Sequence, residues 1–402
     1  MKNLDVSMLV NFSRGNDIGQ HIGIQILRSA CVGANSGCMV LPSSSSEYVL
    51  IFLMIFIFAE PYLYMSGHAL SRILERCSWT TGSYVPLPWL TTGFAHVKAL
   101  LGRNATIEAP SYEREFLLAP NSSTVAIDWY EHPENITKVS HGLLVFFNHG
   151  LNGPISNRII ESATRVASAY HMSLCVVSIQ GVNGVSLSSM QTGLGLSFVI
   201  EMKAATERIN QHLGLSFPKA AFGLSIGGAP VLEFLEQEKS TYSSLILISC
   251  PLDLERFGMM ESELSDLLVS EGKKVVQANS DTLTKSNVEE VTKALEASNV
   301  NDLLANVACK EWGHPSTASL YQFLDPYSCL HRLTKPTLLF YALDDESIDF
   351  FACIDLIRLC RNPNIAVAVT EVGGHCAFQT FGQDWLMDCV CDFASSSFKP
   401  VI

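Results

Sequence analysis

The stretch Gly223-Leu224-Ser225-Ile226-Gly227-Gly228 (GLSIGG) follows an apolar run at 219–222 and precedes a helical pattern over 229–238. A serine at a sharp turn between a strand and a helix needs a strained backbone, and such a turn closes only between small neighbours. The flanking glycines meet that need. The turn would also aim the backbone N–H of Ile226, and the positive end of the following helix, at the place where an oxyanion forms. This pattern is common by chance, so it indicates a catalytic serine only if the rest of the chain supplies the other groups of such a site.

Two acids and a histidine follow later apolar runs. Asp344 and Asp345 come after a run that ends at residue 342, and His375 comes after another that ends at residue 370. A serine hydroxyl becomes a good nucleophile when an imidazole takes its proton, and an acid must hold that imidazole in the right tautomer. Open α/β sheets place such groups just past the carboxyl ends of strands. We therefore predict a triad of Ser225, Asp345 and His375, with Asp344 as the alternative acid.

A glycine-containing loop supplies a further part of the predicted site. His149-Gly150-Leu151-Asn152-Gly153 (HGLNG) follows the apolar run 142–147. The backbone N–H of Leu151 is the candidate second donor of an oxyanion hole, beside that of Ile226. We expect a structural role for the His149 side chain, because backbone groups do the oxyanion work. The order serine, acid, histidine along the chain is that of α/β-hydrolases and differs from the orders in chymotrypsin and subtilisin.

The chain beyond residue 110 alternates short apolar runs with helical patterns. Strands are predicted as a hairpin of 116–118 with 124–129, and then at 142–147, 173–179, 219–222, 244–249, 337–342 and 365–370; helices include 159–169 and 198–213. Near-continuous Val, Ile and Leu runs separated by amphipathic helices indicate a mostly parallel sheet with helices on both faces. Apolar residues at three-to-four spacing predict a helical cap insertion over about 252–332. Residues 111–402 are thus predicted to form one α/β domain.

Residues 1–110 form a separate N-terminal region in this interpretation. Tyr48–Ala59 is an uninterrupted apolar run, too short for a membrane helix of about twenty residues unless it is extended through the residues that follow. We predict a membrane anchor over 48–65, with a core or interfacial element and a signal sequence as alternatives. In a spanning arrangement Arg72 and Arg76 would leave the C-terminal part in the cytosol.

Composition narrows the function classes. With 48% hydrophobic and 16% charged residues the chain has a substantial core, and its net charge of −13 argues against a nucleic-acid binder. The twelve cysteines are scattered, several of them inside apolar runs, which is typical of reduced thiols in a core. No spacing of cysteine and histidine fits a zinc site. We expect neither a metal nor an organic cofactor.

Together these motifs resemble the α/β-hydrolase-domain serine hydrolases, and within them the YheT-like or embryogenesis-associated subgroup. The resemblance spans about 110–395 and rests on HGLNG, GLSIGG, the segment 320–333 (LYQFLDPYSCLHRL), Lys335-Pro336-Thr337-Leu338 before the acids, and Gly373-Gly374-His375. It implies the α/β-hydrolase fold and ester hydrolysis, with acylglycerols, phospholipids and simple acyl esters as substrate classes, and an N-terminal hydrophobic anchor.

The chain departs from that subgroup in two places. Where the subgroup has an Asn-x-Arg-Gly segment followed by a Thr-Pro-Arg stretch, this chain has Ile179-Gln180-Gly181-Val182-Asn183-Gly184 and then Ser188-Ser189-Met190-Gln191. Without those arginines, the resemblance does not carry the subgroup's substrate contacts over to this chain. The acid, usually followed by proline, here precedes Glu346.

The predicted function is a serine hydrolase that cleaves a lipid-like carboxylic ester through an acyl-enzyme. Ser225 attacks the carbonyl, His375 transfers the proton, Asp345 orients the imidazole, and the N–H groups of Leu151 and Ile226 hold the oxyanion. An acyltransferase or peptidase on the same site is an alternative, because an acceptor other than water can take the acyl group. A non-catalytic binding protein of the same fold is another.

Overall fold

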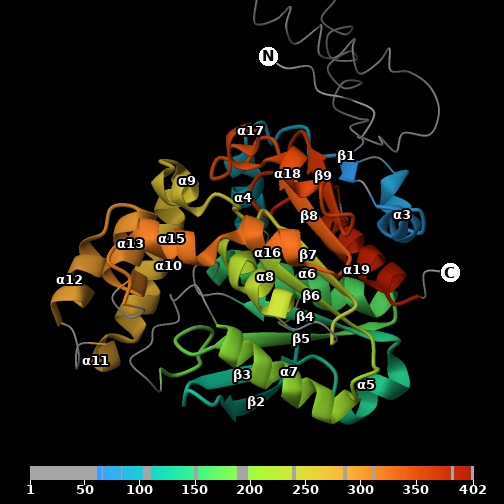
Figure 1. Ribbon diagram of the computed structural model, residues 1–402, viewed down its shortest axis with the longest axis horizontal. Coiled ribbons are helices and arrows are strands. Elements are labelled where there is room, and N and C mark those ends of the chain that lie inside the picture. The colour runs from blue at the N-terminus through green and yellow to red at the C-terminus, as the bar shows by residue number, and fades with distance from the viewer. Residues whose placement is uncertain are drawn as a thin grey trace, which may run out of the picture.

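The computed structural model describes residues 61–65, 67–82, 84–102, 110–148, 153–187, 198–237, 241–283, 288–309, 313–381 and 384–399. These residues fold around one mostly parallel sheet with helices on both faces (Figure 1). The α/β-hydrolase fold class predicted from the sequence is confirmed by this topology.

The sheet of the described residues has nine strands in the order β1-β9-β8-β7-β6-β4-β5-β3-β2. The strands are β1 (Tyr62–Met65), β2 (Glu113–Leu118), β3 (Thr124–Trp129), β4 (Gly142–Asn148), β5 (Met172–Ile179), β6 (Lys219–Leu224), β7 (Ser244–Ile248), β8 (Thr337–Ala342) and β9 (Ile365–Thr370). Neighbouring strands from β5 through β4 to β9 pair in parallel, whereas β2, β3 and β1 pair antiparallel. The central strands β4, β5, β6 and β7 are buried at every position, as expected for a sheet that helices cover on both faces.

Two layers of helices cover the sheet. One layer holds α5 (Pro133–Val139), α7 (Val199–Leu213), α8 (Gly228–Gln237), α16 (Pro326–Arg332) and α18 (Leu356–Leu359); the other holds α3 (His68–Leu74), η2 (Ser78–Thr80), α4 (Gly93–Gly102), α6 (Gly153–Ala169) and α19 (Trp385–Ser397). The short helix α17 (Phe350–Cys353) follows β8. The strands and helices predicted beyond residue 110 are present, and half of them begin or end one to six residues beyond the predicted bounds.

A cap of short helices lies between β7 and β8 in the sequence, to one side of the sheet in Figure 1. The cap comprises α9 (Leu254–Met259), α10 (Glu263–Ala278), α11 (Ser280–Leu283), α12 (Val288–Glu296), α13 (Val300–Asn306) and α15 (Thr317–Leu324). Its helices pack mainly on one another, and α15 also packs on α8 of the body. α16 then returns to the body and leads into β8.

The N-terminal segment departs from the expected division at residue 110. Tyr62–Met65, the end of the predicted anchor, is the edge strand β1 and pairs with β9. The alternation YLYM explains this, because Leu63 and Met65 are buried while the two tyrosines are half-buried. α4 packs on α6, so this segment shares the core of the later residues. The apolar run Tyr48–Ala59 lies outside the described residues.

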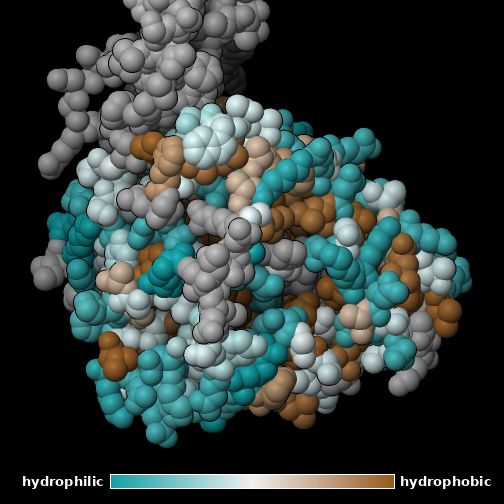
Figure 2. All heavy atoms as spheres, turned by 180° about the vertical axis from the view of Figure 1, so that it is seen from behind, coloured by the Kyte–Doolittle hydropathy of each residue, from teal (hydrophilic) through white to brown (hydrophobic). Residues whose placement is uncertain are grey.

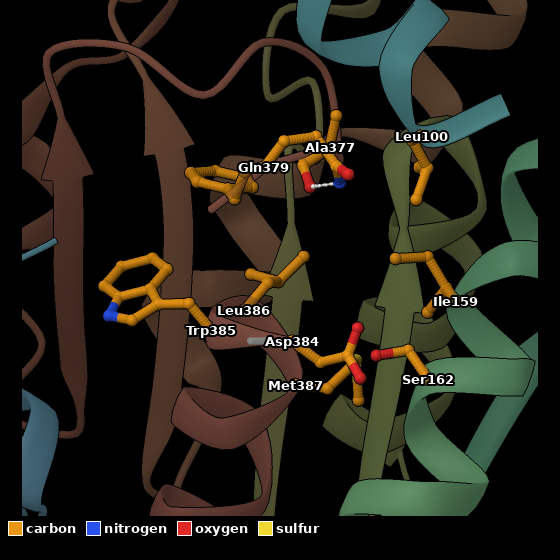
Figure 3. A pocket seen from close by; sticks show the side chains of 10 residues that line it. Leu100, Ile159, Ser162, Ala377, Gln379, Asp384, Trp385, Leu386 and Met387 are labelled. Carbon is orange, nitrogen blue, oxygen red and sulfur yellow. Dashed lines mark hydrogen bonds between the residues drawn. The ribbon is translucent and has the colours of Figure 1, made fainter. Parts of the chain in front are cut away.

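Figure 3 shows a small cavity in the part of the core where α4 packs on α6. Leu100 of α4, Ile159 of α6 and Leu386 of α19 line it together with the segment that follows His375, and its volume is about 20 Å³, enough for one water. Gln379 Nε2 donates to the Ala377 carbonyl, 2.7 Å away, at its edge. Helix α4 therefore packs close to the segment that follows His375, the predicted base.

Within the part of the chain that the structure describes, no helix is both long and apolar enough to cross a bilayer. Apolar side chains are interspersed with hydrophilic ones on the face shown in Figure 2. The described cysteines are all free thiols, and most are buried.

Candidate active site

Ser225 occupies a sharp turn between β6 and α8. Its backbone has φ 50°, in the left-handed region, and its side chain is fully buried. Such strain persists only when the surroundings enforce it. A Cβ at Gly223 would lie 3.1 Å from the Cα of Gly228, and a Cβ at Gly228 would lie 2.7 Å from Sγ of Cys250. Gly223 is thus required by the close approach of the two sides of the turn, and Gly228 by the packing of the turn against Cys250, just after β7.

The three residues of the predicted triad form one hydrogen-bonded chain. His375 Nε2 lies 2.7 Å from Oγ of Ser225, and His375 Nδ1 lies 2.8 Å from Oδ2 of Asp345. A carboxylate only accepts, so Nδ1–H donates to Asp345, which leaves Nε2 free to accept the Ser225 O–H. All three side chains are almost completely buried. They meet because β6, β8 and β9 run parallel and end at the same edge of the sheet.

The two neighbouring acids have different partners. Asp345 faces His375, and its Oδ1 accepts the backbone N–H of Ser347 at 2.9 Å. Asp344 points elsewhere and accepts the backbone N–H of Gly374 at 2.9 Å through Oδ1, while its buried Oδ2 has no hydrogen-bond partner among the residues that the structure describes. Burial, reinforced by the negative charge of Asp345, raises the pKa of Asp344 to about 6. Asp345 therefore contacts the imidazole, whereas Asp344 holds the loop that carries His375.

The imidazole of His375 is held in a closed environment. Burial lowers its pKa, but the adjacent negative charge of Asp345 outweighs this, and the pKa of His375 lies well above its ordinary value. Phe257 of α9 stacks on the ring, with centroids 6.5 Å apart. The cap therefore contributes a wall to the site. Behind the ring, Cys376 donates its backbone N–H to Oγ of Ser249, 3.1 Å away, which fixes the loop after the histidine.

Sequence reasoning missed the support that the N-terminal segment gives this loop. Gly374 has φ +63°, and a Cβ there would lie 2.1 Å from the carbonyl oxygen of Gly93, the first residue of α4. A Cβ at Gly93 would in turn lie 1.9 Å from the carbonyl oxygen of Asp344. Backbones approach this closely only at glycine. No local motif marks Gly93 or Phe257, since their roles depend on segments distant in the sequence.

The two predicted oxyanion donors have different outcomes. Ile226 is buried in the first turn after the serine, where η4 (Ser225–Gly227) leads into α8. Its N–H is at the positive end of that helix, as an oxyanion donor requires. Leu151, the second predicted donor, and the His149 loop around it lie outside the described residues. Among described residues no group of three or more metal-ligating side chains converges.

Comparison with known proteins adds relatives at low identity. No family model matches the chain. Mouse (Mus musculus) phospholipase ABHD3 is 22% identical over 88% of this chain and 87% of its own length, and the human (Homo sapiens) protein of that name is 21% identical with the same coverage.

Solved structures with a similar chain path include esterases. Est1E of Butyrivibrio proteoclasticus, in complex with ferulic acid, has 14% identity and a TM-score of 0.47 over 69% of this chain and 97% of its own. An esterase of Pyrococcus furiosus has 12% identity and a TM-score of 0.44 over 70% and 89%. Similarity at these TM-scores supports no conclusion beyond what the strand order of this chain already shows. The strand order gives this chain the α/β-hydrolase fold.

Proposed function

We propose that this protein is a serine hydrolase that cleaves carboxylic esters through an acyl-enzyme. One observation carries the proposal: the buried chain Ser225 Oγ, His375 Nε2, His375 Nδ1 and Asp345 Oδ2, with both hydrogen bonds below 3 Å. An orienting acid and a base in line with a strained serine are the arrangement that activates a hydroxyl nucleophile.

In the proposed reaction Ser225 Oγ attacks the ester carbonyl carbon, and His375 Nε2 takes the hydroxyl proton. The oxyanion is held by the Ile226 N–H and by the predicted donor Leu151. The bond to the alcohol then breaks, and the alcohol leaves with the proton from Nε2. Water attacks the acyl-enzyme, gives a proton to His375, and releases the acid as Ser225 recovers its proton. Asp345 stays ionised and stabilises the imidazolium in both halves.

A lipid-like ester is the substrate class we propose. The similarity to proteins named phospholipase supports it. The cap supports it as well, since it sets the apolar ring of Phe257 against the site. Membership of the YheT-like subgroup stays a prediction. Of the anchor predicted over 48–65, Tyr62–Met65 is instead strand β1, and membrane attachment through the residues before it stays a prediction.

Labelling with a fluorophosphonate probe tests the proposal. The full chain should react, and Ser225→Ala should not, while both keep the same circular dichroism spectrum and melting temperature. Ser173→Ala is a matched control, because Ser173 is also a buried serine of the sheet, but it lies at the start of β5 with its Oγ 2.6 Å from Oγ of Ser140. It should still carry the probe. A folded wild-type protein that does not react would refute the proposal and favour the binding-protein alternative.

The choice between hydrolysis and acyl transfer depends on the acceptor. Analysis of products from an acyl ester with glycerol present separates the two, because transfer yields acylglycerol and hydrolysis yields free acid. We expect free acid to dominate.

A further inference from the structure

The loop around His375 has a strained backbone. Its residues with positive φ are Gly373, Gly374, Cys376 and Phe378. The last two are not glycine, and their φ values of 60° and 43° lie in the left-handed region that such residues rarely adopt. The backbone N–H of Phe378 donates to the carbonyl of Gly373 at 2.7 Å, which closes a tight turn around the imidazole. A loop of this kind keeps its shape only where contacts from outside enforce it.

Side chains at two strand ends hold the first half of this loop. Asp344, after β8, accepts the backbone N–H of Gly374 at 2.9 Å. Ser249, after β7, accepts the backbone N–H of Cys376 at 3.1 Å. These bonds fix the backbone on both sides of His375, so the position of its imidazole follows the shape of the loop.

The N-terminal segment 84–102 holds the second half of the loop at Gln379. Leu87 donates its backbone N–H to the Gln379 carbonyl at 3.1 Å. The backbone N–H of Gln379 donates in turn to Nδ1 of His96, 3.3 Å away. Gln379 and Leu100, one helical turn after His96 in α4, also line the small cavity in Figure 3. Both backbone groups of Gln379 are therefore bound by a segment distant in the sequence.

His96 is suited to accept this bond. It is completely buried, and burial lowers its pKa to about 4, so the ring is neutral. A neutral imidazole has one nitrogen that donates and one that accepts, and Nδ1 is the acceptor because a backbone N–H can only donate. Gln379 is buried as well. An apolar side chain in place of His96 would leave the Gln379 N–H without this acceptor, which costs free energy.

We propose that His96 is a positioning residue of the triad: through Gln379 it holds the strained loop in the shape that places His375 against Ser225. The inference rests on the proposed function, because it concerns the base of the same reaction. It also makes the segment 84–102, which the sequence predicts to lie outside the α/β domain, a part of the catalytic unit. Detachment of this segment would switch the site off.

Replacement of His96 by leucine tests the inference, because it removes the acceptor and keeps a similar volume. A misplacement of roughly 1 Å in an active site lowers a rate by about 10²-fold. His96→Leu should therefore lower kcat for a p-nitrophenyl ester at least about tenfold, and the rate of fluorophosphonate labelling equally, with KM little changed. Each rate is measured well below the melting temperature of the variant. A purely structural role would lower the melting temperature and leave kcat of the folded protein unchanged.

Two amide variants show whether the acceptor is the property that counts. In His96→Asn the amide oxygen can take the place of Nδ1, so kcat should return to within about threefold of the wild-type value. In His96→Gln the amide lies one bond further out, at the place of Nε2, so this variant should resemble His96→Leu. Ile209→Val is the control for stability, because Ile209 is fully buried in α7, in the opposite layer of helices. It should lower the melting temperature at unchanged kcat.

Wild-type kcat in folded His96→Leu would overturn this inference, while ester turnover preserved the proposed function. An equal loss of kcat in His96→Asn and His96→Leu would also overturn it, as would a His96→Asn variant that does not fold. His96→Gln takes the place of His96→Leu if the latter does not fold. Failure of both to fold would assign His96 to stability alone and overturn the positioning role. A folded wild-type protein without turnover or labelling would refute the proposed function and this inference with it.

Discussion

Replacement of Asp345 by asparagine is the sharpest test of the assignment of the two acids. In the structure Asp345 uses Oδ1 to accept the Ser347 N–H and Oδ2 to accept Nδ1–H of His375. An amide keeps the first bond through its oxygen and then turns its NH₂ toward Nδ1. The imidazole must accept there, so its proton moves to Nε2, which can no longer take the proton of Ser225.

The expected loss follows from that change of tautomer. Such a substitution in a buried triad lowers kcat by about 10⁴-fold, or about 5 kcal/mol in the activation free energy. Asp344→Asn is the matched control, because an amide oxygen can still accept the Gly374 N–H. We expect it to lower kcat less than about tenfold.

The assay is kcat for a p-nitrophenyl ester across pH, with the melting temperature as the control for folding. Acylation needs neutral His375, and Asp345 holds the imidazole pKa above its ordinary value. Activity should therefore rise with pH through that raised pKa, and the residual activity of Asp345→Asn should rise at lower pH. Near-normal turnover in Asp345→Asn, with a large loss in Asp344→Asn, would refute the reasoning and identify Asp344 as the acid.

Three further predictions concern the packing around the site. Gly228→Ala should lower the free energy of unfolding by about 1–3 kcal/mol through overpacking against Cys250, and Cys250→Ala should relieve part of this in urea denaturation; strictly additive effects would contradict the contact. Asp344 has a pKa of about 6 when folded against 3.8 ordinarily, so its contribution to stability falls as pH rises from about 4 to 6. Asp344→Asn should therefore raise the melting temperature more at pH 8 than at pH 4, and an equal gain at both would argue against a raised pKa. Gly374→Ala should abolish turnover or folding, because the added Cβ would force the loop away from the carbonyl of Gly93, the first residue of α4. Gly102→Ala, at an open position of α4, should be tolerated. Normal kinetics in Gly374→Ala would rule out the close contact.

The sequence by itself determined the sheet and the serine turn. Continuous apolar runs mark buried parallel strands, and a glycine-flanked serine between a strand and a helix marks the turn, so both are local patterns. The order of Ser225, the acid and His375 along the chain was sufficient to predict which groups meet. Parallel strands end at one edge, which brings together residues 150 positions apart.

The tertiary structure alone decided between the two acids and attached the N-terminal segment to the core. Asp344 and Asp345 are adjacent and identical, and only the direction of each carboxylate toward His375 or Gly374 separates them. The short alternation of buried and half-buried residues at 62–65 does not predict a strand by itself, because these residues form a strand by pairing with the edge of β9. Contacts between distant segments carry no local signal, because the side chains that make them are set by the fold as a whole.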